Sequence, residues 1–234
     1  VSDEGYGKNE YISTTKPILL VTGPGPGSGK LATCLNNLYH DYKNGSKAGY
    51  AKFETFPIWD LPLNHMVNVA YESATADLRD RNMIDPYHLK TYGAEAVNYN
   101  RDIEAFKLLK RILEKITGGE PMYQSPTDMG VNRASSGIID DKVVQEAAYQ
   151  EVIRRYFRSS VEYAMGMTGK STLDRSMEIM NRIGAKESDR EVVAAARKAA
   201  SDAQEKGKGY GGIYSGAAIQ LHDGTIITGK SSQL

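Results

Sequence analysis

The spacing of apolar and polar residues predicts a chain in which short strands alternate with longer helices. The apolar run at 17–22 has the length of a buried strand and ends at a glycine-rich stretch. Residues 30–44 repeat apolar side chains every three or four positions, which predicts a helix that stops at Gly45. Residues 49–56 alternate with period two, as a strand does. The glycine-rich stretch therefore lies between an expected strand and an expected helix.

Helical periodicity dominates the rest of the chain. It predicts helices over 66–81, 101–117 and 141–164, then one that Gly184 ends and one that Gly207 ends. The expected caps of the second, fourth and fifth helices are Asn100, Ser171 and Ser188, and Asp85-Pro86 is expected to form a turn. Asp223-Gly224 lies between two β-prone runs, which predicts a closing hairpin with a type I′ turn.

This order of elements predicts an α/β fold. We expect a Rossmann-like or P-loop-like layered sheet with helical insertions, followed by a smaller α+β part that ends in the hairpin. A boundary near 166–170 would separate an α/β glycine-loop domain at 1–166 from a C-terminal domain at 167–234. That second domain combines helices with the hairpin and is expected to be incomplete.

Composition narrows the class of protein. The 29 Lys and Arg residues balance 29 Asp and Glu residues, which argues against a nucleic-acid-binding surface. A single cysteine, Cys34, excludes an internal disulfide and a multi-cysteine metal site. The apolar runs are far shorter than the roughly 20 residues of a membrane span, and no signal-peptide pattern follows Val1. We therefore expect a cytoplasmic protein without nucleic-acid or membrane partners, and self-association into a homo-oligomer stays open.

Three segments resemble the phosphate-binding pattern G-x-x-x-x-G-K-[ST]. Gly224–Ser231 matches every letter, but its four middle residues are β-branched and favour a strand over the tight turn that holds phosphate. Gly169-Lys170-Ser171 follows a predicted helix, so we interpret it as the start of the next helix. Neither segment has the strand, loop and helix that the chemistry needs.

The third segment, TGPGPGSGKL at 22–31, misses the pattern but has the right surroundings. Pro24 replaces the first glycine, and Leu31 replaces the hydroxyl residue that binds Mg²⁺. Glycine amides, the positive end of the following helix and the Lys30 ammonium would together hold an anion. Ser28 or Thr33 would then supply the missing hydroxyl. The residues expected to bind phosphate are Gly23, Gly25, Gly27, Ser28, Gly29, Lys30 and Thr33.

Three carboxylates are candidates for the chemistry beside this loop. Glu54 lies near the end of the second expected strand, where ligands of open α/β sheets bind, although an exposed strand glutamate is equally expected. Asp77 lies three residues before Asp80 on a predicted helix, with a solvated face paired to arginines as the alternative. Asp128 lies in a polar loop, with an Asx turn as the alternative. The four histidines lack metal-ligand spacing, so no metal site is predicted.

Six blocks together resemble one family. They are VTGPGPGSGKLATCL, GYAKFETFPIWDLPL, TADLRDRNMIDP, VNYNRD, SPTDMGVN and GAAIQLHDGTIITGK. The chain is similar over essentially its whole length to the bacterial family known as domain of unknown function one-eight-four-six. The resemblance implies an α/β fold with the glycine loop in a Rossmann-like or P-loop-like layer, and it names no reaction. Members of the family are longer, so the chain is expected to be an interior fragment that starts at Val1 instead of Met.

The function expected from these observations is binding of a small phosphorylated ligand at the glycine loop. The cofactor would be ATP or another nucleotide, with Mg²⁺ or without it. An enzyme would carry out ATP-dependent phosphoryl transfer or ligation, with Lys30, Glu54, Asp77 and Asp128 as its catalytic residues. Two alternatives stay open: a non-catalytic nucleotide-binding module, and a structural or partner-binding protein in which the glycine loop is only a turn.

Overall fold

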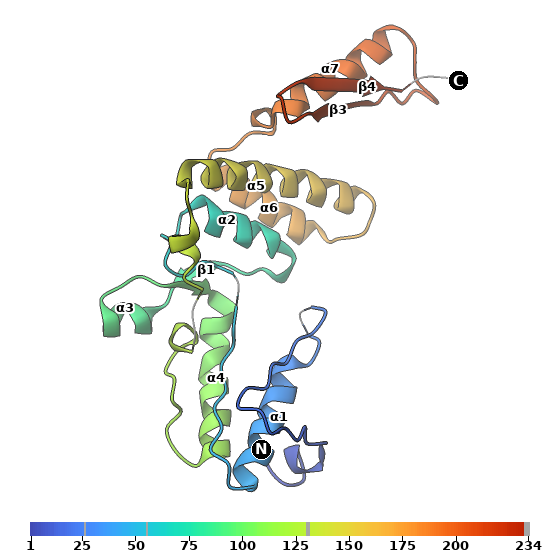
Figure 1. Ribbon diagram of the computed structural model, residues 1–234. Helices are drawn as coiled ribbons and strands as arrows, with labels where there is room; N and C mark the ends of the chain where they lie inside the picture. The colour runs from blue at the N-terminus through green and yellow to red at the C-terminus, as the bar shows by residue number, and fades with distance from the viewer. Residues whose placement is uncertain (26, 55, 130–131, 232–234) are drawn as a thin grey trace. The chain divides into compact units, whose positions relative to one another are not determined.

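The computed structural model describes residues 1–25, 27–54, 56–129 and 132–231, and its ribbon is shown in Figure 1. Contacts within the chain divide it into two compact units. Unit 1 consists of Val1–Asn68 and Asp80–Ile139, and unit 2 consists of Val69–Arg79 and Asp140–Leu234. The domain boundary expected near 166–170 stays a prediction.

Unit 1 is built around two helices, α1 (Lys30–Lys43) and α4 (Asn100–Thr117). Both were expected, because their apolar residues form one stripe on each helix. The stripes meet in a buried cluster of Leu35, Leu38, Tyr39, Leu113 and Ile116. Figure 1 shows the chain after α1 running back beside α4. This core supports the glycine loop, since the loop leads directly into α1.

Short elements complete unit 1. They are η1 (Tyr6–Lys8), β1 (Asn82–Ile84), α3 (Pro86–Tyr92), β2 (Val97–Tyr99), η3 (Pro126–Asp128) and η4 (Ala134–Gly137). Strands β1 and β2 form an antiparallel pair in which Met83 lies opposite Asn98. Asp85 caps α3 by accepting a hydrogen bond from Tyr87 N at 2.9 Å, so Asp85-Pro86 begins a helix where a turn was expected.

The layered sheet expected around the glycine loop does not occur in the described residues, where both sheets are two-stranded and antiparallel. Residues 17–22 and the described part of 49–56 belong to no strand. Ile18 and Leu20 are 80% and 78% exposed, and Phe53 is 75% exposed. The apolar pattern is present in both segments, but a strand also needs a hydrogen-bonded neighbour.

Two helix predictions near the border of the units were also wrong in part. The helix expected over 66–81 is α2 (Met66–Ala74) followed by the single turn η2 (Ala76–Leu78), and Arg79 ends it with a φ of 58°. Asn100 is the first residue of α4 and not its cap. Its side-chain oxygen accepts a hydrogen bond from Arg81 N at 2.8 Å, because β1 brings that amide close.

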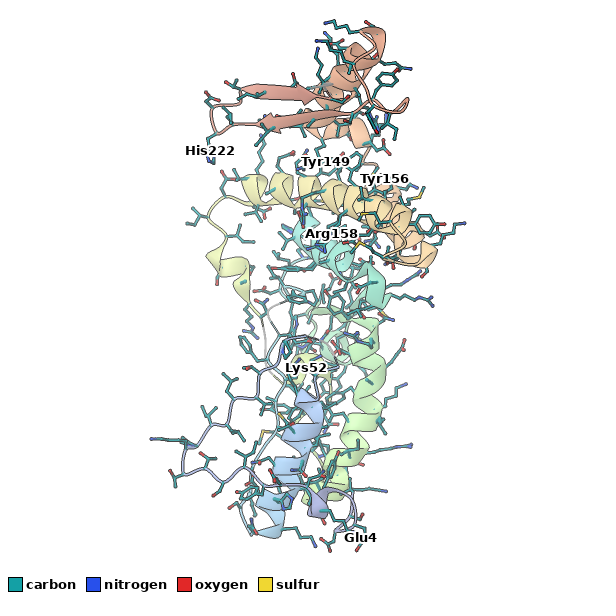
Figure 2. All side chains as sticks on the ribbon, turned by 90° about the vertical axis from the view of Figure 1, so that its right-hand side faces the viewer. Glu4, Lys52, Tyr149, Tyr156, Arg158 and His222 are labelled. Atoms are coloured by element: carbon teal, nitrogen blue, oxygen red, sulfur yellow. The ribbon has the colours of Figure 1, made fainter. Side chains whose placement is uncertain are left out.

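Unit 2 contains α5 (Asp141–Ala164) and α6 (Lys170–Arg182), which pack against each other through buried residues such as Ile153 and Ile179. Tyr149, Tyr156 and Arg158 of α5 are labelled in Figure 2. Glu72 is 2% exposed and forms ion pairs with Arg175 and with Arg182. This buried carboxylate ties residues 69–79 to α6.

The C-terminal part of unit 2 is η5 (Glu187–Asp189), α7 (Glu191–Glu205) and the hairpin of β3 (Gly216–Gln220) and β4 (Ile226–Lys230). The hairpin packs on α7 so closely that a Cβ on Gly216 would lie 2.1 Å from Ala196 O. The hairpin was predicted correctly, but its turn is not type I′. That turn needs two residues of positive φ, and Asp223 does not share the positive φ of Gly224.

The serine caps expected in unit 2 were wrong as well. Helix α6 begins at Lys170 after Gly169, so Ser171 lies inside its first turn. Ser188 lies inside η5, and α7 begins only at Glu191. Among the described residues, no helix combines the length and the apolar character needed to cross a bilayer.

Candidate functional site

The glycine loop adopts a backbone that needs glycine at two positions. Gly27 and Gly29 have φ of 73° and 89°, in the left-handed region that other residues rarely adopt. Gly29 is the N-cap of α1, and no side chain caps that helix end. The first intrahelical amide is Thr33 N, which bonds Gly29 O at 3.0 Å. The three preceding amides have no partner within the helix, as at every helix start, and they can bind an anion.

Side chains close the loop on itself. Lys30 Nζ donates to Gly25 O at 2.7 Å and to Ser28 Oγ at 3.0 Å. Ser28 Oγ in turn donates to Gly25 O at 2.8 Å. A Cβ on Gly23 would lie 2.3 Å from Ser28 Oγ, so glycine allows this side chain to cross the loop. The expected ligands Gly23, Gly25, Ser28 and Lys30 therefore lie together at the start of α1.

A second group of charged residues in unit 1 contains Glu54. Lys52 Nζ forms ion pairs with Glu54 and with Asp102 Oδ1, the latter at 2.9 Å. Both carboxylates are largely buried, and Asp102 belongs to the first turn of α4. Lys52 is labelled in Figure 2. The lysine thus holds two carboxylates that come from segments almost 50 residues apart.

The electrostatics of this cluster favour a proton on Glu54. Burial raises the pKa of Glu54, and the charge of Asp102 raises this pKa further, while Lys52 opposes both. Burial alone would lower the pKa of Lys52, but the two carboxylates raise it. Glu54 is therefore a carboxyl group that can exchange a proton closer to neutral pH than an exposed glutamate can.

Tyr50 links this cluster to α1. Burial raises the pKa of Tyr50, and Cys34, Glu54 and Asp102 add to this effect, so its hydroxyl lies near all three groups. Cys34 lies four residues after Lys30 in α1, and residues with this spacing share one face of a helix. Tyr50 also packs against the core that α1 and α4 form, so it connects the segment of Lys52 and Glu54 to α1.

The other two predicted acidic residues have different surroundings. Asp128 accepts hydrogen bonds from Tyr92 Oη at 2.8 Å and Gln124 N at 3.0 Å, and not from the glycine loop. Asp77 is an exposed residue of η2 in unit 2. Asp80 is buried in unit 1 and lies 3.3 Å from Arg101 Nη2. Within the described ranges, no three His, Cys, Asp or Glu residues come together as metal ligands would.

Sequence reasoning did not select Lys52 and Asp102 as site residues. The period-two pattern at 49–56 contained a signal for Lys52, because residues two apart in an extended segment point to the same side and Lys52 is two before Glu54. No local signal pointed to Asp102. Its place in the cluster depends on how α4 packs beside this segment.

The two rejected phosphate-loop patterns have the structures that their surroundings predicted. Residues 226–230 of the letter-perfect segment form β4. Gly169 precedes α6 with a φ of −81°, which any residue can adopt. Among the three patterns, only the segment at 22–31 combines left-handed glycines with a helix start in the described part of the chain.

Comparison with known proteins finds close relatives in bacteria. The model described as "Domain of unknown function DUF1846, N-terminal" matches residues 1–184, and its C-terminal counterpart matches residues 188–234. A "UPF0371 protein" of Clostridium botulinum is 59% identical over 234 residues, which are 100% of this chain and 46% of that protein. A relative from Fusobacterium nucleatum is 60% identical over 241 residues, and the match covers 100% of this chain and 47% of that protein. The chain spans about half the length of the curated relatives that it matches.

Proposed function

Since the chain belongs to the family described as domain of unknown function DUF1846, whose N-terminal model covers residues 1–184, we propose that it binds a nucleotide or another phosphorylated small molecule at residues 23–30. One observation carries this proposal. Gly27 and Gly29 turn the backbone through left-handed conformations directly before an uncapped helix start, and the Lys30 ammonium lies over the same loop.

The loop can bind phosphate by exchanging its present hydrogen bonds for stronger ones. Lys30 Nζ now donates to a neutral carbonyl and a neutral hydroxyl. A phosphate oxygen would replace them with an ion pair, in which the acceptor is charged as well as the donor. The free amides of the first turn of α1 and the helix dipole favour the same anion. With Mg²⁺ present, the hydroxyl of Ser28 or Thr33 would be its protein ligand.

The cluster of Lys52, Glu54 and Asp102 makes catalysis the favoured form of this proposal. Glu54 would take a proton from the group that attacks the bound phosphate, as in phosphoryl transfer or ATP-dependent ligation. Within the described residues, Asp128 bonds Tyr92 and Gln124, and Asp77 is exposed, so neither residue supports this role. The proposal places this activity in the cytoplasm, where ATP is available. The alternative is a binding module without turnover.

The proposal also includes a layered sheet around the glycine loop. A Rossmann-like or P-loop-like sheet would give residues 17–22 and 49–56 hydrogen-bonded neighbours. It would also cover Ile18, Leu20 and Phe53, whose side chains are exposed. The support is the apolar pattern of these segments, which is typical of strands inside a sheet.

The test is a titration of the full-length protein with ATP, ADP, inorganic phosphate and NAD, each with Mg²⁺ and without it. We expect Lys30→Ala to weaken binding about tenfold to a hundredfold, since a charge-assisted hydrogen bond contributes about 1.5–3 kcal/mol. Lys170→Ala is the matched control, because Lys170 also follows a glycine and begins a helix. The affinity of Lys170→Ala for each ligand should equal that of the unchanged protein.

Two results would contradict the proposal. The unchanged protein could bind none of the four ligands, or Lys30→Ala and Lys170→Ala could weaken binding equally. Glu54→Gln then separates enzyme from binding module. We expect this variant to keep its affinity and to lose turnover if Glu54 moves the proton.

A further inference from the structure

A separate cavity of about 230 Å³ opens in unit 1. Its walls include Trp59, Asp60, His88, Glu95, Ala96 and Arg133. None of these residues belongs to the glycine loop or to the cluster of Lys52. The cavity is smaller than the sites of drug-sized ligands, which measure about 300–1,000 Å³. It therefore suits a compact molecule.

The wall that contains Trp59 is rigidly held. Trp59 N donates to Asn132 O at 3.1 Å, and Trp59 O accepts from Val97 N at 3.0 Å. Asn68 is fully buried, and its side chain bonds both the amide and the carbonyl of Ile58. These bonds fix the backbone that carries Trp59.

Trp59 has an unused hydrogen-bond donor. The residue is 2% exposed, and its Nε1 has no acceptor in the part of the chain that the structure describes. A buried indole N–H normally has a hydrogen-bond partner. This N–H has almost no accessible surface, so a ligand in the cavity does not reach it.

Hydrogen bonds orient His88, another residue of the cavity wall. Thr127 Oγ1 donates to Asp85 Oδ2 at 2.8 Å, and both residues are buried. Its single proton is used in that bond, so His88 Nδ1, at 3.2 Å from Thr127 Oγ1, must be the donor to this oxygen. The other ring nitrogen of His88, Nε2, is left to meet a ligand.

The remaining walls carry both signs of charge. Arg133 provides a guanidinium, while Asp60 and Glu95 provide carboxylates. Asp60 Oδ2 accepts a hydrogen bond from Ser135 Oγ at 2.5 Å, which leaves Oδ1 for another donor. A phosphate would meet two carboxylates here, and a simple cation would meet the guanidinium. A small molecule that itself carries both charges fits best.

We propose that this cavity binds a free α-amino acid. Its carboxylate would pair with Arg133. Its ammonium group would pair with Glu95 and with the free oxygen of Asp60. Its side chain would lie against the rings of Trp59 and His88. This proposal is independent of the glycine loop, because the two sites share no residue.

The experiment is calorimetric titration of the full-length protein with the twenty standard L-amino acids, one at a time. For each amino acid that binds, its N-acetyl derivative and its amide serve as probes that lack one charge. We expect saturable binding of at least one amino acid and a loss of more than tenfold for both derivatives. The proposal is overturned if no amino acid binds at millimolar concentration, or if either derivative binds as well as the parent.

Three variants connect binding to this cavity. Arg133→Gln should weaken binding at least tenfold, whereas Arg111→Gln, an exposed arginine of α4 outside the cavity, should not change it. The bound amino acid should also change tryptophan fluorescence, and that change should disappear in Trp59→Phe. Unchanged affinity in Arg133→Gln, or an unchanged fluorescence response in Trp59→Phe, would overturn the assignment.

Discussion

The same dipeptide, glycine followed by lysine, begins a helix in each unit, but the two helix starts differ. Gly29 precedes α1 with φ of 89° and ψ of 1°, whereas Gly169 precedes α6 with φ of −81° and ψ of 158°. Only the first glycine needs the left-handed conformation. Lys30 also folds back over its loop and bonds Gly25 O. The conformation of the preceding loop, and not the dipeptide, therefore distinguishes the proposed anion-binding loop from an ordinary helix start.

The two helix starts also differ in what anchors them. The glycine loop is mostly exposed, and its own backbone and side chains hold it together. Helix α6 is anchored by buried charges, because Glu72 pairs with Arg175 and Arg182. Local contacts within the glycine loop therefore hold the start of α1, whereas the core of unit 2 holds α6.

The largest effect is expected from Glu72→Ala. Removing this carboxylate leaves the buried Arg175 with only the exposed Glu178 as an ion-pair partner, and loss of one member of a buried pair costs about 3–5 kcal/mol. Urea denaturation should show this loss in the free energy of unfolding. Glu178→Ala is the control, because Glu178 pairs with the same arginine from an exposed position and should cost less than about 1 kcal/mol. Equal costs for the two variants would contradict the contrast in anchoring.

A smaller effect, with opposite signs in the two helix starts, is expected from glycine to alanine substitutions. Gly29→Ala should destabilise by about 1–2 kcal/mol, because alanine is strained at positive φ. Gly169→Ala should be neutral or stabilise by up to about 1 kcal/mol, because its φ suits alanine and the added Cβ would meet only Ser171 Oγ at 3.8 Å. Thermal denaturation of both variants checks this. If both substitutions destabilised the protein, or both stabilised it, the result would contradict the difference in backbone conformation.

The smallest effect concerns how carboxylates respond to pH. The pKa of Glu54 is raised in the folded protein, so folding favours its protonated form. The stabilisation that the protonated Glu54 provides is therefore present below the unfolded pKa and is lost as pH rises through the folded pKa. Glu54→Gln should therefore match the unchanged protein near pH 4 and be the more stable of the two near pH 7. Unfolding measured across this range tests the sign.

Glu151 in α5 is the control of opposite sign. A hydrogen bond from Arg154 lowers the pKa of Glu151, so its contribution is present above the unfolded pKa and is lost as pH falls through the folded pKa. Glu151→Gln should be less stable than the unchanged protein near pH 7 and should approach it in acid. If the stability of both variants, relative to the unchanged protein, changed in the same direction with pH, the cluster of Lys52 would not disfavour a charged Glu54.

Much of the helical structure could be predicted from sequence, and most of the sheet could not. The helices α1, α4 and α5 were predicted from local patterns, and in the structure α1 packs on α4 and α5 packs on α6. The strands expected at 17–22 and 49–56 needed a hydrogen-bonded neighbour that the described residues do not provide. The prediction of Asn100 as a helix cap was wrong for a related reason. Its side chain bonds Arg81 N and not an amide of its own helix.

The candidate site divides in the same way. The sequence by itself determined the glycine loop, because the freedom of glycine and the period of a helix are local properties. Only the tertiary structure decided that Asp102 would join Glu54 at Lys52, or that Thr127 would lie between Asp85 and His88. These partners are about 40–50 residues apart in the chain. Their meeting depends on which side chains the packed core buries together, and no local pattern encodes that choice.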